Sequence, residues 1–393
     1  MTDNSPDVPP HPARIFLSAA EHSGDRHGAS LIAAIGERAP ETRFFGVAGP
    51  RMQQAGCEAM DDLTERSAML VRAIQMVGHA WRLLRRVRSR LRAEPADLAI
   101  LIDSPALHLP MARHIRAAGC PVLYYIAPQL WAWAPWRIGR VRRRVDHLAA
   151  ILPFEQDYFR GRGVPTDFVG HPLVEQLKEA SSEADLCAEL RGAGKPVIAC
   201  LPGSRRHVVN EVLPGQIEVA RTIAQHHPDA IILFAAADAS AGTTIETALR
   251  TERFHYCVLV DRNAEVLQAA DLALCASGTA TLEVAWHHVP MIVMYNGSKW
   301  GYRLVGRWLV RTPHLCLVNI LADRRIVPEF MPYYTSTAPI AAEALDLLAD
   351  ASRREAMQND LRDVIDSLGT MSASSRTAEL ALSMARNRND RPG

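Results

Sequence analysis

The feature that most constrains the fold of this chain is an alternation of short apolar runs with helix-like stretches, which occurs twice. Continuous apolar runs separated by amphipathic segments are typical of parallel strands that helices cover on both faces. The sequence therefore predicts an α/β protein with two doubly wound, Rossmann-like domains that face a cleft. The runs are 14–19, 43–49, 98–103, 121–127, 147–154 and 167–172, then 196–205, 230–238, 256–260, 272–280 and 290–296.

A polar, helix-prone stretch over residues 178–194 separates the two series of apolar runs. The chain has 393 residues. Single hydrophobic cores rarely grow beyond about 250–300 residues, so two cores are expected. We predict a disordered tail over 1–13, an N-terminal domain over 14–177, a second domain over 178–355 and C-terminal helices over 356–393.

Charge and cysteine content argue against several classes of protein. The net charge is +1, so the field of the whole molecule favours neither nucleic acid nor an acidic partner. The seven cysteines form no C-x-x-C pair, which indicates reduced thiols in a cytoplasmic protein without a structural zinc. The polar start lacks the regions of a signal peptide, and no apolar run reaches the ~18 residues of a membrane-spanning helix.

In open α/β sheets the ligand lies beyond the carboxyl ends of the strands, so the loops there are candidate sites. The loop CLPGSRR over 200–206 places a glycine where the backbone can approach a ligand closely. Ser204 is suited to capping the next helix, and the Arg205 guanidinium offers a fork of donors suited to phosphate. Taken alone, the loop is equally consistent with an ordinary turn between a strand and a helix.

A second loop of this kind, Ser277-Gly278-Thr279, ends the run 272–280, and a helix is expected to begin at once. The free N–H groups and the dipole of such a helix, roughly +0.5 charge, favour a pyrophosphate. Glu283 lies one turn later, where it either binds ribose hydroxyls or only complements the helix dipole. Two such loops predict nucleotide binding, although neither is a Walker A or a G-x-G-x-x-G motif. No D-x-D occurs, which disfavours a diphosphate chelated by a metal ion. We predict neither a metal site nor a cofactor.

The first strand and helix of the chain meet in the segment SAAEHSGDRHGA, residues 18–29. Ser23 and Asp25 are typical helix starters. His22 and His27 suggest a metal site, but no third ligand has suitable spacing. A structural interpretation of the two histidines is therefore favoured.

Asp103 directly follows the apolar run LAILI. It is either the polar end of a strand or a reacting group at the mouth of a cleft, and the residues alone leave both interpretations open.

Two basic amphipathic segments are candidates for contact with a membrane surface. Residues 66–92 contain eight arginines and no acidic residue, and residues 299–311 place four cations at spacings of four. A helix with cations on one side and Trp or Leu on the other can lie in an anionic membrane interface. The alternative is an amphipathic helix that packs on its own core. The residues expected to face the membrane are Leu70, Ile74, Trp81, Trp300 and Trp308.

An ordered set of motifs from about residue 14 to about residue 335 is similar to one known family. The chain resembles the lipid-A-disaccharide synthases. The resemblance implies a metal-independent, inverting glycosyltransferase of the GT-B fold, in which the C-terminal helices, residues 356–393 here, cross back to the N-terminal domain. The motifs are AEHSGDRHGA, GVAGPRM, LIDSP, APQLWAW, LPFE, GVPTDFVGHPL, LPGSR, ASGTATLE and LVNILADRRIVPE.

The resemblance also implies an activity and a location. The family transfers 2,3-diacylglucosamine from UDP to the 6-hydroxyl of 2,3-diacylglucosamine 1-phosphate and releases UDP. Because both sugars carry acyl chains, a peripheral enzyme on the cytoplasmic face of the inner membrane is implied. The resemblance also implies a homodimer. The first domain is then the acceptor side and the second binds the UDP-sugar.

Individual roles follow where residues match the family motifs. Asp103 matches the essential aspartate, and we expect it to act as the general base. Contacts to UDP or its phosphates are expected from Ser204, Arg205, Ser277, Gly278, Thr279, Glu283 and Asn319. Further substrate contacts are expected from Ser23, Asp25, Gln129 and Glu329.

The chain departs from the family pattern just after Asp103. The family reads D-x-P-D-F-N there, whereas this chain has Ala106 and His108 in place of the second aspartate and the asparagine. The donor side matches better than the acceptor side. Three alternatives therefore remain: a glycosyltransferase with another acceptor, a UDP-sugar 2-epimerase, and a UDP-sugar-binding protein without catalysis.

Overall fold

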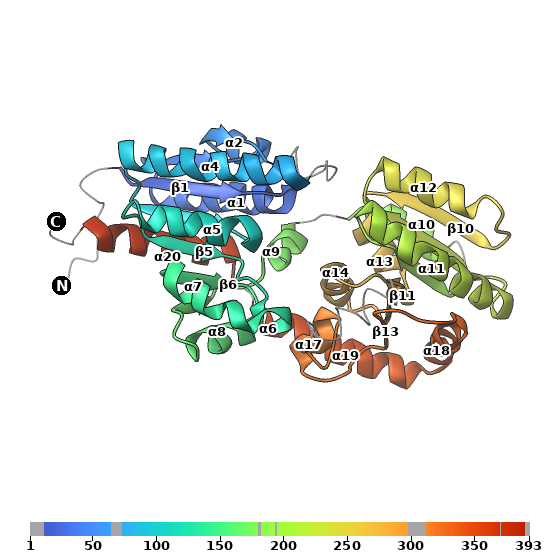
Figure 1. The fold of residues 1–393 in the computed structure, drawn as a ribbon. Helices are drawn as coiled ribbons and strands as arrows, with labels where there is room; N and C mark the ends of the chain where they lie inside the picture. Colours follow the sequence, from blue (N-terminus) through green and yellow to red (C-terminus); the bar gives the residue numbers. More distant parts are fainter. Residues whose placement is uncertain are drawn as a thin grey trace. The chain divides into compact units, whose positions relative to one another are not determined.

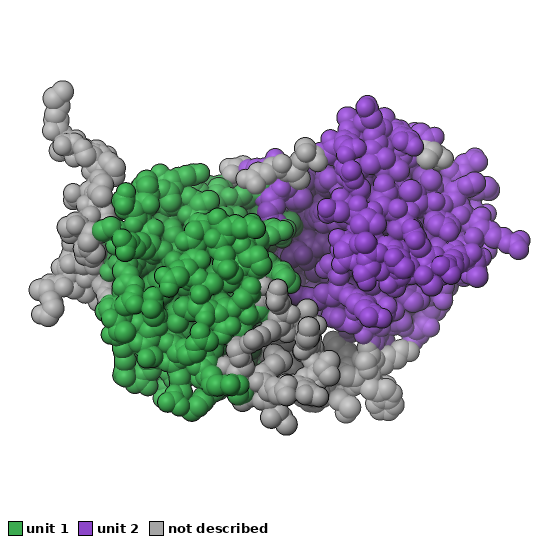
Figure 2. Space-filling model, turned by 90° about the horizontal axis from the view of Figure 1, so that it is seen from above, with its two compact units in different colours: residues 1–175, 370–393 green, residues 176–369 purple. Residues whose placement is uncertain are grey.

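The computed structural model describes residues 12–63, 73–179, 182–192, 195–297, 312–369 and 371–389. The chain forms two compact units, which Figure 2 shows in different colours. The first unit comprises residues 1–175 and 370–393, and the second comprises residues 176–369.

The described residues of the first unit form a seven-stranded parallel sheet with the strand order β3-β2-β1-β4-β5-β6-β7 (Figure 1). The order reverses direction after β1, so neighbouring strands β1 and β4 are not consecutive in the chain. The strands are β1 (Arg14–Ala19), β2 (Arg43–Val47), β3 (Cys57–Asp61), β4 (Leu98–Ile102), β5 (Val122–Tyr125), β6 (His147–Ala150) and β7 (Thr166–Phe168).

Helices cover both faces of this sheet, which explains why its strands are apolar on both sides. Along β1, Ile15 and Leu17 belong to one core, whereas Phe16 belongs to the other. The Ile15 side is covered by α1 (His22–Arg38), α2 (Pro50–Gln54) and α20 (Ala373–Asn389). The Phe16 side is covered by α4 (Ala73–Ala93), α5 (Pro105–Arg116), α7 (Ile138–Arg144) and α8 (Pro153–Arg160). The short α6 (Leu130–Trp133) and η1 (Pro135–Arg137) connect β5 to α7, and α9 (Pro172–Glu179) follows β7.

The second unit repeats the plan with a parallel sheet that has the order β10-β9-β8-β11-β12-β13 in the part of the chain that is described. Here the reversal falls between β8 and β11. The strands are β8 (Val197–Leu201), β9 (Ile231–Ala236), β10 (His255–Val260), β11 (Leu272–Cys275), β12 (Met291–Met294) and β13 (Glu329–Phe330). The helices are α10 (Ala184–Gly192), α11 (Arg206–His226), α12 (Ala239–Leu249), α13 (Asn263–Ala269), α14 (Ala280–Trp286), α17 (Leu317–Ala322), α18 (Ala338–Ala349) and α19 (Ala351–Ser367).

The C-terminal segment differs from the sequence prediction. We expected residues 356–393 to return to the first domain together. Instead α19 packs on α14, α17 and α18 of the second unit, and the chain returns at residue 370. Only α20 joins the first unit, where it packs against α1. The first crossing lies between residues 175 and 176, two residues before the predicted boundary.

Within the described ranges, no helix is both long enough and apolar enough to span a membrane.

Candidate functional site

The candidate loops lie at the points where the strand order of each sheet reverses. At such a point the connections of two neighbouring strands leave in opposite directions, and the crevice between them is the usual ligand site of an open α/β sheet. In the first sheet the loops after β1 and β4 meet there, and they contain Glu21 and Asp103. In the second sheet the loops after β8 and β11 meet, and they contain Arg205 and Ser277.

The turn that carries Asp103 has an unusual backbone. Asp103 and the next residue, Ser104, have φ angles of 52° and 45°, and Ile126 after the neighbouring strand has a φ of 67°. Left-handed conformations of residues other than glycine cost on the order of 1–3 kcal/mol each, and they cluster at functional sites. Asp103 is half-buried, and its N–H donates to the carbonyl of Tyr125 over 2.9 Å. The strained turn therefore agrees with a functional role for Asp103.

A buried polar cluster lies beneath this turn. The Tyr124 hydroxyl donates to the main-chain carbonyl of Asp103 over 2.5 Å. The Nδ1 atom of His108 lies 2.7 Å from the same carbonyl, and its Nε2 lies 2.9 Å from Oγ of Ser18. Burial lowers the pKa of His108 to about 4, so the ring is neutral at pH 7. Sequence reasoning did not identify this cluster as a unit.

Asp25, a predicted substrate contact, has a structural role at the start of α2. Its side chain is buried, and its two carboxylate oxygens accept the N–H groups of Arg51 and Met52 at the start of α2 over 2.9 and 3.0 Å. Gly28, one turn later in α1, allows the helix to pack closely, because a Cβ there would meet Met52 Sδ at 2.5 Å. Ser23 is exposed in the first turn of α1, and its contact with substrate stays a prediction.

The segment after β5 contacts Glu155 of α8, a glutamate to which the sequence analysis gave no role. The indole Nε1 of Trp131 donates to its Oε1 over 3.0 Å, and the N–H of Leu152 donates to its Oε2 over 3.2 Å. Burial raises the pKa of Glu155 to about 7. Gln129, a predicted substrate contact, is exposed just before α6. The bond between Trp131 and Glu155 thus fixes the segment that follows Gln129.

The two predicted phosphate loops of the second unit lie side by side. The N–H of Ala276 donates to the carbonyl of Leu201 over 2.9 Å, which joins the ends of β11 and β8. Gly203 has a φ of 104°, and a Cβ there would lie 2.8 Å from Cγ1 of Val208. Glycine is therefore required for the turn. Ser204 and Arg205 are exposed, and Arg205 stands at the N-terminus of the 21-residue helix α11.

The second phosphate loop is open to solvent. Gly278 and Thr279 are exposed and Ser277 is half-buried just before α14. Glu283 of α14 accepts the side-chain amide of Asn263, whose Nδ2 lies 3.2 Å from each carboxylate oxygen. Asn263 begins α13 after β10 and was not predicted from the sequence. It orients Glu283 at the edge of the sheet where ribose binding was expected.

Asn319, a predicted UDP contact, also has a structural role. Its Oδ1 accepts the N–H groups of Ile326 and Val327 over 2.8 and 3.0 Å. Its Nδ2 donates to the carbonyl of Val327 and to Oε1 of Glu329, each over 2.9 Å. The amide is fully buried, and all of its hydrogen-bonding capacity is used.

Glu329 belongs to the same network. Its Oε2 accepts the N–H groups of Leu315 and Cys316 over 2.9 and 2.7 Å, and His314 lies 3.4 Å from its Oε1. The pair Asn319 and Glu329 therefore closes the loop between α17 and β13. Glu329 thus stabilises this loop, and its contact with substrate stays a prediction.

The basic helix α4 divides into a core face and an exposed face. Leu83, Val87 and Leu91 are buried in the first unit, as the alternative interpretation predicted. Trp81 is 58% exposed, and the guanidinium of Arg85 lies 4.7 Å from its ring centroid. Leu70, Trp300 and Trp308 lie outside the described residues, as does the side chain of Ile74.

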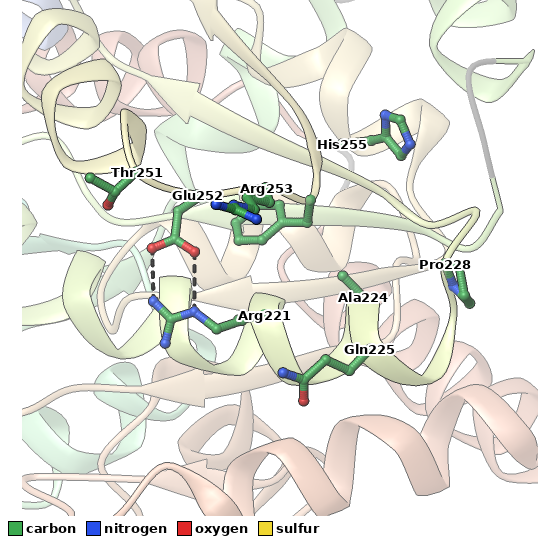
Figure 3. A pocket seen from close by; sticks show the side chains of 9 residues that line it. Arg221, Ala224, Gln225, Pro228, Thr251, Glu252, Arg253 and His255 are labelled. Atoms are coloured by element: carbon green, nitrogen blue, oxygen red, sulfur yellow. Dashed lines mark hydrogen bonds and ion pairs between the residues drawn. The ribbon is translucent and has the colours of Figure 1, made fainter.

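A cavity of about 500 Å³ lies at the opposite end of the second sheet (Figure 3). Its walls include Pro228 and His255, which lie where β9 and β10 begin, and Arg221 of α11. Arg221 donates to both carboxylate oxygens of Glu252 over 2.7 and 3.1 Å. Because this cavity lies away from the carboxyl ends of the strands, we do not assign it to the candidate site.

Two doubly wound units with ligand-type loops at their strand reversals define a GT-B protein. The MurG structure of Acinetobacter baumannii superposes with a TM-score of 0.58 at 12% identity, over 95% of this chain and 100% of that chain. A putative UDP-N-acetylglucosamine 2-epimerase of Listeria monocytogenes gives a TM-score of 0.62 at 14% identity, over 98% of each chain. These likenesses establish the fold, and they confirm the predicted fold class.

Sequence similarity then identifies the family. A family model described as lipid-A-disaccharide synthetase matches residues 15–384. The lipid-A-disaccharide synthase of Geobacter sulfurreducens is 35% identical over 373 residues, which are 94% of this chain and 97% of that protein. The chain belongs to the lipid-A-disaccharide synthase family. It is a glycosyltransferase of lipid A biosynthesis, as the resemblance implied.

Proposed function

We propose that this enzyme transfers 2,3-diacylglucosamine from UDP to the 6-hydroxyl of 2,3-diacylglucosamine 1-phosphate, with inversion and release of UDP. The observation that carries the proposal is the position of Asp103 and of the loop with Arg205 at the strand reversals of their sheets. The family supports the reaction class. The two positions support binding of the acceptor by the first unit and of the UDP-sugar by the second.

The proposed roles follow from the chemistry of each loop. Asp103 removes the proton of the acceptor hydroxyl as that oxygen attacks the anomeric carbon of the donor. The leaving UDP gathers negative charge, which Arg205 and the N–H groups around Gly278 stabilise. Glu283, oriented by Asn263, binds the ribose hydroxyls. Ser204, Ser277 and Thr279 contact the phosphates, and Ser23 and Gln129 contact the acceptor.

The proposal is tested by incubating the purified chain with UDP-2,3-diacylglucosamine, with and without 2,3-diacylglucosamine 1-phosphate. We expect a β-1′,6-linked disaccharide and an equal amount of UDP only when both sugars are present. An epimerised donor formed without the acceptor would replace the proposal with a 2-epimerase. Donor binding without turnover of either sugar would indicate a binding protein, and turnover with a different acceptor only would correct the acceptor.

We also propose that the enzyme works as a peripheral protein at the cytoplasmic face of the inner membrane. Its substrates carry acyl chains, and α4 presents Trp81 and Arg85 together to solvent. A tryptophan with a neighbouring cation is suited to the interface of an anionic membrane. The homodimer implied by the resemblance is part of this proposal, and analytical ultracentrifugation measures it.

Replacing Trp81 by serine is expected to weaken binding to phosphatidylglycerol vesicles by about 10–100-fold, because burying a large apolar side chain contributes about 1.5–3 kcal/mol. Co-sedimentation with the vesicles measures the change. Tyr256 of β10 is a matched control, since it is an aromatic residue that is 38% exposed on the second unit. Equal binding of the Trp81→Ser and Tyr256→Ser variants would exclude α4 from the membrane contact.

A further inference from the structure

The turn after β4 depends on contacts that its own residues do not supply. Asp103 and Ser104 are two successive residues with left-handed φ angles, and neither is a glycine. Aspartate and serine have short polar side chains, and aspartate in particular tolerates this conformation better than most residues, but a run of two still needs external support. The carbonyl of Asp103 is the group through which that support reaches the turn.

Two donors on different elements hold this carbonyl. One is the hydroxyl of Tyr124 in β5, the strand next to β4, and the other is Nδ1 of His108 in the first turns of α5. The main-chain N–H of His108 also donates to the carbonyl of Ser104 over 3.0 Å. His108 therefore contacts the carbonyls of both left-handed residues at once.

The hydrogen bonds fix which ring nitrogen of His108 carries the proton. A main-chain carbonyl can only accept, so Nδ1 must donate to Asp103. In the neutral ring Nε2 is then an acceptor, and Oγ of Ser18 donates to it over 2.9 Å. Ser18 and His108 are both fully buried, and Ser18 lies in β1 on the other side of the strand reversal. The ring is thus held at both nitrogens between β1 and the turn.

We propose that His108 is a positioning residue for Asp103: its Nδ1–H holds the left-handed turn that carries the Asp103 carboxylate, and Ser18 holds the ring in that tautomer. This inference rests on the proposed role of Asp103 as the general base. It also gives a physical meaning to the departure from the family pattern, in which an asparagine occupies this position. The amide nitrogen of an asparagine lies about where Nδ1 of a histidine lies, so either residue can supply the same donor.

The two substitutions His108→Asn and His108→Leu separate positioning from space filling. We expect His108→Leu to lower kcat by about 10–100-fold, because a misplacement of about 1 Å in a reacting group costs on the order of 10²-fold. The affinity for UDP, measured by calorimetry, is expected to stay unchanged. His108→Asn keeps the donor to Asp103 and is expected to recover most of the lost kcat. Both variants lose the bond to Ser18, so a loss that depended only on folding would affect them alike.

A double-mutant cycle shows whether His108 acts through Asp103. In an Asp103→Asn background, His108→Leu is expected to reduce the residual rate no further, because the group that it positions is already gone. Equal kcat values for the His108→Leu variant and the unchanged enzyme would overturn the proposal. Equal losses in the leucine and asparagine variants, or full additivity with Asp103→Asn, would overturn it as well.

A readout without turnover keeps this inference separate from the proposed function. The carboxyl ¹³C resonance of Asp103, identified by its loss in Asp103→Asn, is expected to shift in His108→Leu and to stay near its original position in His108→Asn. A shift in a chain that makes no disaccharide would reject the proposed reaction but not the positioning. A resonance that is unchanged in His108→Leu would reject the positioning whatever the enzyme's activity.

Discussion

Replacing Asp103 by asparagine is expected to lower kcat by about 10²–10⁴, which is the usual contribution of a general base. Asparagine is nearly the same size as aspartate and, unlike most residues, also tolerates the left-handed backbone found at position 103. The change therefore removes the proton acceptor without opening the turn. An alanine would confound the two effects, because it is strained at this φ.

Steady-state kinetics of disaccharide formation measure this effect, with UDP affinity and thermal unfolding as controls. Both controls are expected to stay unchanged, since Arg205 and the other UDP residues belong to the second unit. A variant that keeps a near-normal kcat would remove Asp103 from the role of base. A variant that loses UDP affinity as well would indicate a wider structural effect.

Most of the architecture was predictable because it depends on a regular pattern. Apolar runs that are covered on both faces are distinct in the sequence, and each of the predicted runs overlaps a strand. β3 and β13 were missed for physical reasons. β3 is a polar edge strand whose residues Glu58 and Ala59 are exposed, and β13 has only two residues. Neither has the continuous burial that makes a strand visible in a sequence.

The two ends of the C-terminal segment show what periodicity cannot predict. α19 and α20 have similar lengths and a similar balance of apolar and polar residues. α19 packs in the second unit and α20 in the first, and the chain crosses at residue 370. Which core a helix joins depends on its tertiary partners. The helices themselves were therefore predictable from the sequence, but the unit in which each one packs was not.

The candidate site residues were predictable from the sequence where they lie together in one loop. The loops with Asp103, Arg205 and Ser277 follow apolar runs directly, and the rule for open α/β sheets selects them. The support of those loops was not predictable. Asn263 reaches Glu283 from a different helix, and a cluster beneath Asp103 is assembled from β1, β5 and α5. Such contacts join residues that are 20 to 90 positions apart, and no local pattern signals them.

Motif residues also differ in what they do. Asp25 and Asn319 both match family motifs, yet each is buried with its polar atoms bonded to the main chain. A match to a motif does not separate residues that hold a loop from residues that touch a ligand. Burial and hydrogen-bonding capacity separate them, and a pair of substitutions in the second unit can test the distinction.

Replacing Asn319 by alanine is expected to destabilise the second unit by about 2–4 kcal/mol, since buried groups that lose their partners cost about 1–3 kcal/mol each. The N–H groups of Ile326 and Val327 would lose their acceptor, and Glu329 would lose a donor. For a unit of this size the loss corresponds to about 5–15 °C in its unfolding temperature. Scanning calorimetry measures that change, and UDP affinity at low temperature is expected to stay unchanged.

Arg205→Ala is the matched variant, and it should give the opposite result. Its side chain is exposed at the start of α11, where surface interactions contribute about 0–1 kcal/mol, so the unfolding temperature should hardly change. UDP affinity should fall by about 10–100-fold, because hydrogen bonds between charged groups contribute about 1.5–3 kcal/mol. A loss of UDP affinity in an Asn319→Ala variant of normal stability would indicate that Asn319 contacts UDP. An unchanged UDP affinity in Arg205→Ala would indicate that the N–H groups at the two strand ends, and not Arg205, bind the phosphates of UDP.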